Sequence, residues 1–255
     1  MSGCGHRGVV LLHGWGFSGA DWDPVIRALR ARGFSGPVHA PDLPGHGQAP
    51  GGDELADPSV VAAGLAAALP ADAGQPVWVG WSLGGLVALA AARRAECAHG
   101  CVLITANPRF VRDTHWEAAL DPHELEAFAD LLAHDPARLR RQFAALCARG
   151  AENPGELART LRARLEAAAA RPAALAAGLA ALRDVDRRAD LDAVAPLAAL
   201  LAADDALVPV AVERELAARA PAARVARVPG PHALPLAAPD VVAEFIHATV
   251  AEAPA

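Results

Sequence analysis

The sequence Gly-Trp-Ser-Leu-Gly-Gly at residues 80–85 constrains the fold more than any other feature of this chain. An apolar run at 77–79 comes just before it, and residues 86–92 have the composition of a helix. A serine on such a sharp strand-to-helix turn presents its hydroxyl outward, and glycines flank it because a Cβ there would collide with the neighbouring strand or helix. The start of the helix also offers unpaired N–H groups to an anion. The motif therefore predicts Ser82 as a nucleophile at the edge of a sheet.

Six apolar runs have the composition of parallel strands that are covered on both faces. They lie at residues 9–12, 37–41, 77–79, 100–105, 196–203 and 224–228. Helical patterns lie between several of these runs and after the last one. They span residues 21–32, 58–69, 86–92 and 239–250. This alternation predicts an α/β fold, with a mainly parallel sheet flanked by helices.

The alternation stops between residues 109 and 184. This stretch has a helical composition throughout, interrupted by prolines at 122, 136, 154 and 172. We interpret it as a helical lid inserted into the sheet domain. The sequence therefore predicts a core made of residues 1–108 and 185–255, with residues 109–184 covering the site.

An acid and a histidine follow the last two predicted strands. Asp205 comes just after the run at 196–203, and His232 lies in a Gly/Pro-rich loop after 224–228. Ligands of open α/β sheets bind at the carboxyl ends of strands, and the chain order Ser, Asp, His is that of α/β-hydrolases. The histidine would take the serine proton and the carboxylate would orient the imidazole. Asp205 is favoured over its neighbour Asp204, which fits a turn hydrogen bond better.

Two backbone amides are the candidates for an oxyanion hole. One is the N–H of Leu83, directly after the nucleophile, and the other is the N–H of Trp15 in the loop that follows the first strand. His13 is interpreted as a brace for that loop, and His46 as a loop-packing residue.

Composition excludes several classes of function. The net charge of −6 argues against a general nucleic-acid binder, and no apolar run reaches membrane-spanning length without interruption. The start of the chain does not have the pattern of a signal peptide. The cysteines have neither metal-ligand nor disulfide-framework spacing; they are Cys4, Cys97, Cys101 and Cys147. We expect a cytoplasmic enzyme without metal or cofactor, acting as a monomer on neither nucleic acid nor membrane.

Several longer motifs are more specific than the catalytic positions alone. They are His-Gly-Trp-Gly at 13–16, Asp-Leu-Pro-Gly-His-Gly at 42–47, Gly-Trp-Ser-Leu-Gly-Gly-Leu-Val-Ala at 80–88 and Asp-x-Leu-Val-Pro at 205–209. In these motifs the chain resembles the pimeloyl-acyl-carrier-protein methyl ester esterases of biotin synthesis, a family of the α/β-hydrolase superfamily. The helix at 141–146 and the segment at 177–187 also resemble the lid of that family.

The resemblance implies a serine carboxylesterase that hydrolyses the methyl ester of pimeloyl-acyl-carrier protein through an acyl-enzyme intermediate. It implies substrate contacts from Trp15, Ser82, Leu83, Phe143, Ala144, Leu146, Cys147 and His232. It also implies that arginines of the lid bind the acidic carrier protein, namely Arg138, Arg141, Arg159 and Arg162. A cationic patch on an acidic protein fits such a partner, although each arginine could instead pair with a nearby glutamate.

Two other functions remain open at this stage. A general short-chain carboxylesterase or thioesterase would share the three catalytic residues but would not depend on a carrier protein. A non-catalytic binding protein with the same fold would not require all three of them.

Overall fold

The computed structural model describes residues 7–94 and 98–252 of the chain. Its centre is a six-stranded sheet in the order β2-β1-β3-β4-β5-β6, and every pairing in it is parallel. The strands are β1 Val9–Leu12, β2 Val38–His39, β3 Val77–Trp81, β4 Gly100–Ile104, β5 Leu197–Ala202 and β6 Arg224–Val228. The predicted α/β fold is confirmed.

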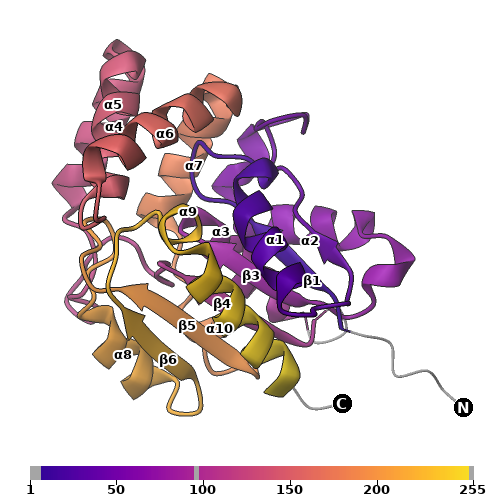
Figure 1. The fold of residues 1–255 in the computed structure, drawn as a ribbon. Helices are drawn as coiled ribbons and strands as arrows, with labels where there is room; N and C mark the ends of the chain where they lie inside the picture. The colour runs from indigo at the N-terminus through magenta and orange to yellow at the C-terminus, as the bar shows by residue number, and fades with distance from the viewer. Residues whose placement is uncertain (1–6, 95–97, 253–255) are drawn as a thin grey trace, which may run out of the picture.

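Helices cover both faces of the sheet (Figure 1). Those of the sheet domain are α1 Asp23–Ala31, α2 Pro58–Ala68, α3 Leu83–Ala92, α8 Val212–Arg219, α9 Leu234–Ala237 and α10 Pro239–Glu252. In the view of Figure 1, α1 and α10 pack together in front of the sheet, whereas α2 and α3 pack together behind it. The short helix α8 was not among the helices expected from the sequence.

Four helices lie between β4 and β5 and stand together at one end of the sheet (Figure 1). They are α4 Pro122–His134, α5 Pro136–Ala148, α6 Pro154–Ala167 and α7 Pro172–Asp184, and we call them the insertion helices. Each begins at one of the four prolines, because the first residue of a helix needs no N–H donor and proline already has helical φ.

The expectation of helix throughout 109–184 was wrong for its first 13 residues. Residues 109–121 contain no helix and form isolated bridges, among them Arg109 with Asp186 and Val111 with Leu120. Phe110, Val111 and Trp116 are buried in this segment. Its apolar side chains therefore pack on the core from an irregular backbone, and a helix begins only where Pro122 supplies a start.

The core is centred on β1, β3, β4 and β5, in which every residue is buried. Helix α3 is also buried along its whole length. Burial on both faces explains why these strands read as continuous apolar runs rather than as alternating patterns. At the edge, β6 exposes Arg224 and Arg227 and is only half-buried elsewhere.

Cysteines and apolar helices add little to the architecture. Cys101 and Cys147 are free and buried, whereas Cys4 and Cys97 lie outside the described residues. Within residues 7–94 and 98–252, no single helix is long and apolar enough to cross a membrane; α6 and α7 pass that test only as a pair bent by 119°.

Candidate active site

The predicted catalytic residues meet at the carboxyl edge of the sheet. Ser82 directly follows β3, Asp205 follows β5, and His232 follows β6. Because all the strands are parallel, their carboxyl ends lie side by side, and the insertion helices rise from the same edge (Figure 1).

Ser82 has a backbone conformation that few side chains adopt, with φ of 54° and ψ of −122°. Its N–H donates to the carbonyl of Ile104 at 3.1 Å, and its own carbonyl accepts from the N–H of Gly85 at 2.8 Å. These bonds hold the residue in the left-handed region, which is disfavoured for a residue with a Cβ. The turn therefore fixes the serine at the point where β3 becomes α3.

The glycines around Ser82 are required by close approaches of the backbone. A Cβ on Gly80 would lie 2.3 Å from the carbonyl oxygen of Gly84, and one on Gly84 would lie 2.4 Å from that of Leu12. A Cβ on Gly85 would meet the Cβ of Ala106 at 2.6 Å. The start of α3 consequently presses against the ends of β1 and β4, as predicted from the motif.

His232 and Asp205 form a buried hydrogen-bonded pair. Nδ1 of His232 lies 2.8 Å from Oδ2 and 3.1 Å from Oδ1 of Asp205, and both side chains are 1% exposed. Oδ1 of Asp205 also accepts from the N–H groups of Leu207 and Val208, at 2.8 and 2.9 Å. The carboxylate is therefore held on one side by backbone donors and orients the imidazole on the other.

Asp204 takes a different position. It is exposed, its N–H donates to the carbonyl of Gly230 at 3.1 Å, and its Oδ2 accepts from the N–H of Gly230 at 3.4 Å. It thus joins the loop after β5 to the loop that carries His232 without contacting the imidazole by a hydrogen bond.

The carbonyl of His232 is fixed by two donors from neighbouring strands. The indole Nε1 of Trp81 donates to it at 3.0 Å and the hydroxyl of Thr105 at 2.9 Å. On the ring, Nε2 is buried and has no hydrogen-bond partner among the described residues. Nε2 is therefore the nitrogen that remains able to accept a proton, because Nδ1 faces Asp205.

The candidate oxyanion amides belong to two segments next to Ser82, the start of α3 and the loop after β1. Leu83 is the first residue of α3, so its N–H has no acceptor within the helix. The loop after β1 lies against the serine, since a Cβ on Gly14 would be 3.4 Å from the Cβ of Ser82. Trp15 follows Gly14 directly, which brings its backbone to the same neighbourhood.

Two buried histidines hold that loop. His13 receives the N–H of Leu43 on Nε2 at 2.8 Å, and its Nδ1 lies 2.9 Å from the carbonyl of Gly14. His46 receives the N–H of Gly16 on Nε2 at 3.3 Å, and its Nδ1 lies 3.0 Å from the carbonyl of Pro44. Burial lowers the pKa of both rings, that of His13 to about 3 with a contribution from His46. Both are therefore neutral near pH 7, with one nitrogen donating and the other accepting.

An aromatic cluster lies over the loop after β1. The ring of Trp15 meets that of Phe143 edge-on, with centroids 5.0 Å apart at 86°, and Phe17 packs on Trp81 at 4.5 Å. The indole Nε1 of Trp15 donates to the carbonyl of Leu175 at 2.8 Å. Trp15 is thus held between the sheet domain and helices α5 and α7.

The other substrate contacts implied by the resemblance lie on α5. Ala144 and Cys147 are buried and Leu146 is half-buried. The carbonyl of Cys147 accepts from the N–H of Ala233 at 3.0 Å, so this part of α5 adjoins the histidine loop. Leu146 packs against the hydrophobic core, and within residues 7–94 and 98–252 no contact assigns its side chain to the site.

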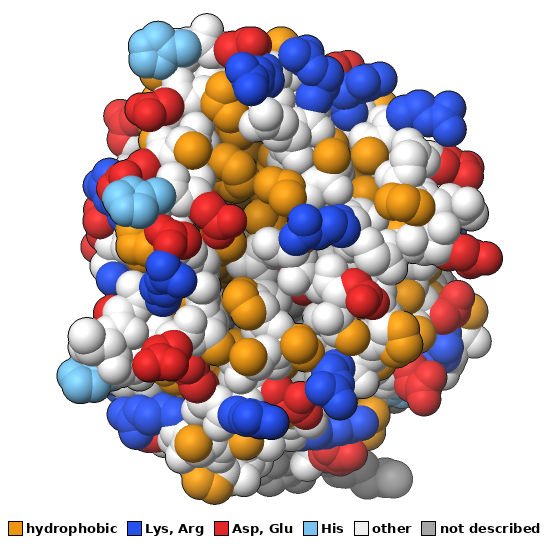
Figure 2. Space-filling model, turned by 90° about the vertical axis from the view of Figure 1, so that its left-hand side faces the viewer, with side chains coloured by type: hydrophobic (Ala, Val, Ile, Leu, Met, Phe, Trp, Pro, Cys, Tyr) orange, Lys and Arg blue, Asp and Glu red, His pale blue; other side chains and the backbone are white. Residues whose placement is uncertain are grey.

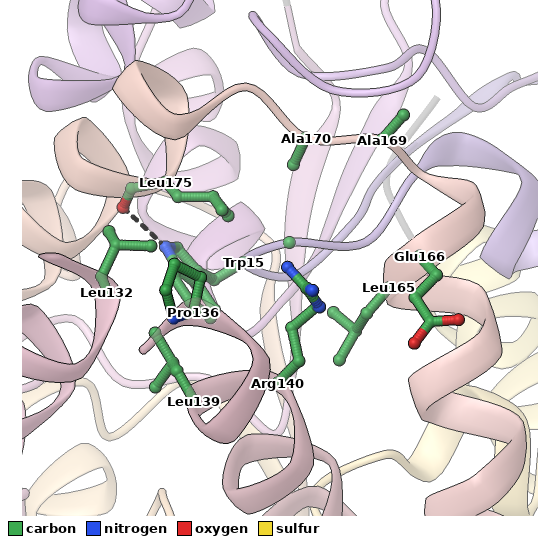
Figure 3. Close-up of a pocket in the computed structure, with 11 residues that line it drawn as sticks. Trp15, Leu132, Pro136, Leu139, Arg140, Leu165, Glu166, Ala169, Ala170 and Leu175 are labelled. Atoms are coloured by element: carbon green, nitrogen blue, oxygen red, sulfur yellow. Dashed lines mark hydrogen bonds between the residues drawn. The ribbon is translucent and has the colours of Figure 1, made fainter. Parts of the chain in front are cut away.

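A pocket of about 220 Å³ lies between Trp15 and the insertion helices. Its lining includes the leucines at 132, 139, 165 and 175 and two charged residues, Arg140 and Glu166. Arg140 points into it from α5 (Figure 3). The buried Trp15 thus lies between the loop beside Ser82 and this pocket among the insertion helices.

Comparison with known proteins identifies the family. The model of the alpha/beta hydrolase family matches residues 9–245. The chain is 39% identical over 250 residues to a pimeloyl-[acyl-carrier protein] methyl ester esterase of Xanthomonas campestris pv. campestris (strain B100), covering 96% of each chain. A protein of the same name from Aromatoleum aromaticum is 41% identical over 227 residues, covering 86% of this chain and 88% of the relative.

The chain belongs to the alpha/beta hydrolase family.

Solved structures agree on the fold of this hydrolase. A bromoperoxidase from Bacillus anthracis superposes with a TM-score of 0.86 at 22% identity, covering 96% of this chain and 92% of that one. An esterase from Exiguobacterium antarcticum gives 0.81 at 18% identity, covering 96% and 92%. The resemblance to the pimeloyl-acyl-carrier-protein methyl ester esterases noted from the motifs is also confirmed, since those relatives are similar over nearly the whole chain.

Four arginines of the insertion helices lie on the outer surface of the molecule. Arg138, Arg141, Arg159 and Arg162 are exposed, and within the described part of the chain none forms an ion pair. In Figure 2, basic side chains gather along the upper edge of the molecule, where the insertion helices lie, above a group of hydrophobic side chains. Arg164 is not part of this patch, because it pairs with the buried Asp21 at 2.9 Å.

Two features of the site were not predicted from the sequence. The donors to the His232 carbonyl, Trp81 and Thr105, directly end or follow β3 and β4, so their place at the carboxyl edge was a usable signal. The contact of Trp15 with α7 has no such local signal, because its partner lies 160 residues away. In residues 7–94 and 98–252, no group of three or more His, Cys, Asp or Glu is arranged to hold a metal ion.

Proposed function

We propose that this hydrolase cleaves the methyl ester of pimeloyl-acyl-carrier protein in biotin biosynthesis, releasing methanol and the free carboxylate. The observation that carries the proposal is the buried Asp205–His232 pair at the sheet edge that bears Ser82, in a chain about 40% identical to esterases named for this substrate. The geometry supports ester cleavage at this site, and the names of the relatives support the choice of substrate.

Ser82 is the proposed nucleophile and His232 its general base. Nε2 of His232 takes the proton of the Ser82 hydroxyl as the oxygen attacks the ester carbonyl, and the resulting oxyanion binds the N–H groups of Leu83 and Trp15. The tetrahedral intermediate collapses, His232 returns the proton to the methoxide, and methanol leaves. Water, activated by the same imidazole, then hydrolyses the acyl-enzyme. Asp205 holds the imidazole and stabilises its charged form.

The remaining assignments concern the insertion helices and the partner. Residues 109–184 act as a lid over a core made of 1–108 and 185–255, and the side chains of Trp15 and Phe143 contact the acyl chain. The exposed Arg138, Arg141, Arg159 and Arg162 bind acidic residues of the carrier protein. The enzyme works as a cytoplasmic monomer.

The test compares pimeloyl-acyl-carrier protein methyl ester with p-nitrophenyl acetate. Methanol release from the carrier-bound ester that disappears in Ser82→Ala, while the variant keeps its circular dichroism spectrum, supports the proposal. Cleavage of p-nitrophenyl acetate alone would instead indicate a general carboxylesterase or thioesterase. Activity on neither ester would indicate a binding protein or a different ester.

The carrier dependence has its own test. Replacing Arg138, Arg141, Arg159 and Arg162 together by Gln should lower kcat/KM on the carrier-bound ester by about tenfold or more, because charge-assisted contacts to the carrier are lost. Hydrolysis of p-nitrophenyl acetate should stay unchanged, since these side chains are exposed on the outer surface whereas Ser82 is buried. Equal losses on both substrates would contradict carrier docking at this patch.

A further inference from the structure

Strand β4 is the middle strand of the candidate site, although none of the three catalytic candidates follows it. In the sheet it lies between β3, which leads to Ser82, and β5, which leads to Asp205. The residue directly after β4 is Thr105, which is fully buried. Buried hydroxyl groups nearly always have a hydrogen-bond partner, and the partner of this one belongs to the proposed general base.

Two neighbouring residues at the end of β4 hold the nucleophile and the base. The carbonyl of Ile104 accepts the N–H of Ser82 at 3.1 Å, and the hydroxyl of Thr105 donates to the carbonyl of His232 at 2.9 Å. The same carbonyl accepts from the indole of Trp81, the residue before Ser82, at 3.0 Å. The main chain of the base is thereby joined to the main chain of the nucleophile through the end of β4.

The backbone of Thr105 has a conformation that its residue type disfavours. Its φ is 41°, in the left-handed region, where a β-branched residue is an outlier. The N–H of Thr105 donates to the carbonyl of Leu200 at 2.8 Å, which ties this conformation to β5. Glycine or asparagine would adopt it at lower cost, and strained backbone of this kind persists mostly at functional sites. What the threonine adds is the hydroxyl group that binds His232.

We propose that Thr105 is a positioning residue of this esterase, which fixes the main chain of His232 so that Nε2 of the ring meets the hydroxyl of Ser82. The assignment rests on the proposed function, because it requires His232 to act as the general base. Asp205 holds the ring at Nδ1 with a contact of 2.8 Å, and Thr105 holds the same residue at its carbonyl. Two separate points of attachment are needed because a misplacement of about 1 Å can lower the rate of a proton-transfer step by about a hundredfold.

The test removes the hydroxyl while keeping the shape of the side chain. Thr105→Val loses the donor and keeps the branched Cβ, whereas Thr105→Ser keeps the hydroxyl and loses a methyl group. Hydrolysis of p-nitrophenyl acetate is measured, and active sites are counted by labelling Ser82 to completion with a fluorophosphonate. Per active site, Thr105→Val should lower kcat and kcat/KM alike, by about tenfold or more, because His232 transfers a proton in forming and in hydrolysing the acyl-enzyme. Thr105→Ser should keep most of the wild-type kcat.

Thr249→Val is the matched control. Thr249 is also buried, and its hydroxyl donates at 2.9 Å to a carbonyl, that of Phe245 in α10. This variant should keep the wild-type kcat per active site. The assignment is overturned if Thr105→Val keeps that kcat as well, or if Thr105→Ser loses as much as Thr105→Val. Fewer active sites with an unchanged kcat would show that Thr105 serves stability alone, which also overturns it.

A second substrate separates this assignment from the proposed function. Because Thr105 acts through His232 and not through the ester, Thr105→Val should also slow hydrolysis of pimeloyl-acyl-carrier protein methyl ester, and an unchanged rate there would overturn the assignment. A wild type that cleaves only p-nitrophenyl acetate would overturn the proposed substrate, while the Thr105 variants still decide the role of Thr105 on that ester. A wild type that cleaves neither ester would overturn both.

Discussion

The carbonyl of Cys147, in the last turn of α5, accepts a hydrogen bond of 3.0 Å from the N–H of Ala233, the residue after His232. An insertion helix is thereby tied to the loop that carries the proposed general base. The thiol of Cys147 is also close enough to Asp205 for the carboxylate to influence its ionisation. The insertion helices thus contact the candidate site at two places, the histidine loop through Cys147 and the loop after β1 through Trp15.

Cys147 should not react with alkylating reagents in the folded protein. Burial raises the pKa of its thiol well above the usual value, and the charge of Asp205 adds to the effect, whereas the reactive species is the thiolate. Mass spectrometry after treatment with iodoacetamide at pH 8 should find Cys147 unmodified in native protein and modified in urea. Ala145→Cys, on the exposed face of the same helix, provides a thiol that should be alkylated readily; equal labelling of the two would contradict the burial of Cys147.

Asp205→Asn should lower kcat on any cleaved ester by about 10⁴-fold. An amide in place of the carboxylate no longer stabilises the protonated imidazole and favours the wrong tautomer of His232. Asp204→Asn changes the neighbouring acid, which has a hydrogen bond to Gly230 but none to His232, and should keep kcat close to that of the wild type. Steady-state kinetics with p-nitrophenyl acetate suffice, and a larger loss in the Asp204 variant would reverse the assignment of the acid.

Gly84→Ala should destabilise the protein strongly. Its Cβ would lie 2.4 Å from the carbonyl oxygen of Leu12 and 2.7 Å from that of His13, so the backbone of α3 or β1 must move. We expect a decrease of about 3 kcal/mol in the free energy of unfolding, measured by urea denaturation. Gly64→Ala is the matched control, because this exposed glycine of α2 has open space around its Cβ position; it should raise the same free energy by about 0.5–1 kcal/mol.

Stability should fall as the pH falls below about 6.5. Burial holds the pKa of His13 at about 3 and also lowers that of His46, so the folded protein does not take up the protons that the unfolded chain binds. Each such histidine makes its full contribution to the free energy of unfolding above its unfolded pKa of about 6.5. Between that pH and its folded pKa, the contribution decreases by about 1.4 kcal/mol for each unit of decreasing pH.

The pH effect can be assigned to His13 by comparing variants. His13→Asn should be less stable at pH 7.5 because it loses the bond from Leu43, but its free energy of unfolding should decrease less steeply between pH 6.5 and 5. His134→Asn removes an exposed histidine and should keep the slope of the wild type. Identical slopes in all three proteins would show that His13 takes up its proton equally in both states.

Much of the sheet domain could be predicted because its signals are local. The apolar runs mark strands that are buried on both faces, and the glycines around Ser82 mark a turn whose backbone contacts exclude a Cβ. Ser82, Asp205 and His232 could be selected as candidate catalytic residues for the same reason, since each follows its strand within a few positions. Family membership is confirmed by matches that extend over nearly the whole chain.

The parts that could not be predicted depend on partners distant in sequence. The ion pair of Arg164 with the buried Asp21 joins residues 143 positions apart, and no local pattern indicates it. Residues 109–121 were expected to be helical because their composition permits a helix, but packing of Phe110 and Trp116 on the core gives an irregular segment. The orientation of Arg140 toward a pocket, unlike its neighbours Arg138 and Arg141, depends on how α5 lies against α6 and α7.

Each insertion helix begins at its own proline, at residues 122, 136, 154 and 172. Because every start is marked independently, a residue added or deleted near the end of one helix leaves the register of the next helix unchanged. The surface formed by the insertion helices can therefore be remodelled during evolution one helix at a time, while the turn that carries Ser82 stays in place. A hydrolase built in this way can acquire a new substrate while its catalytic residues keep their positions.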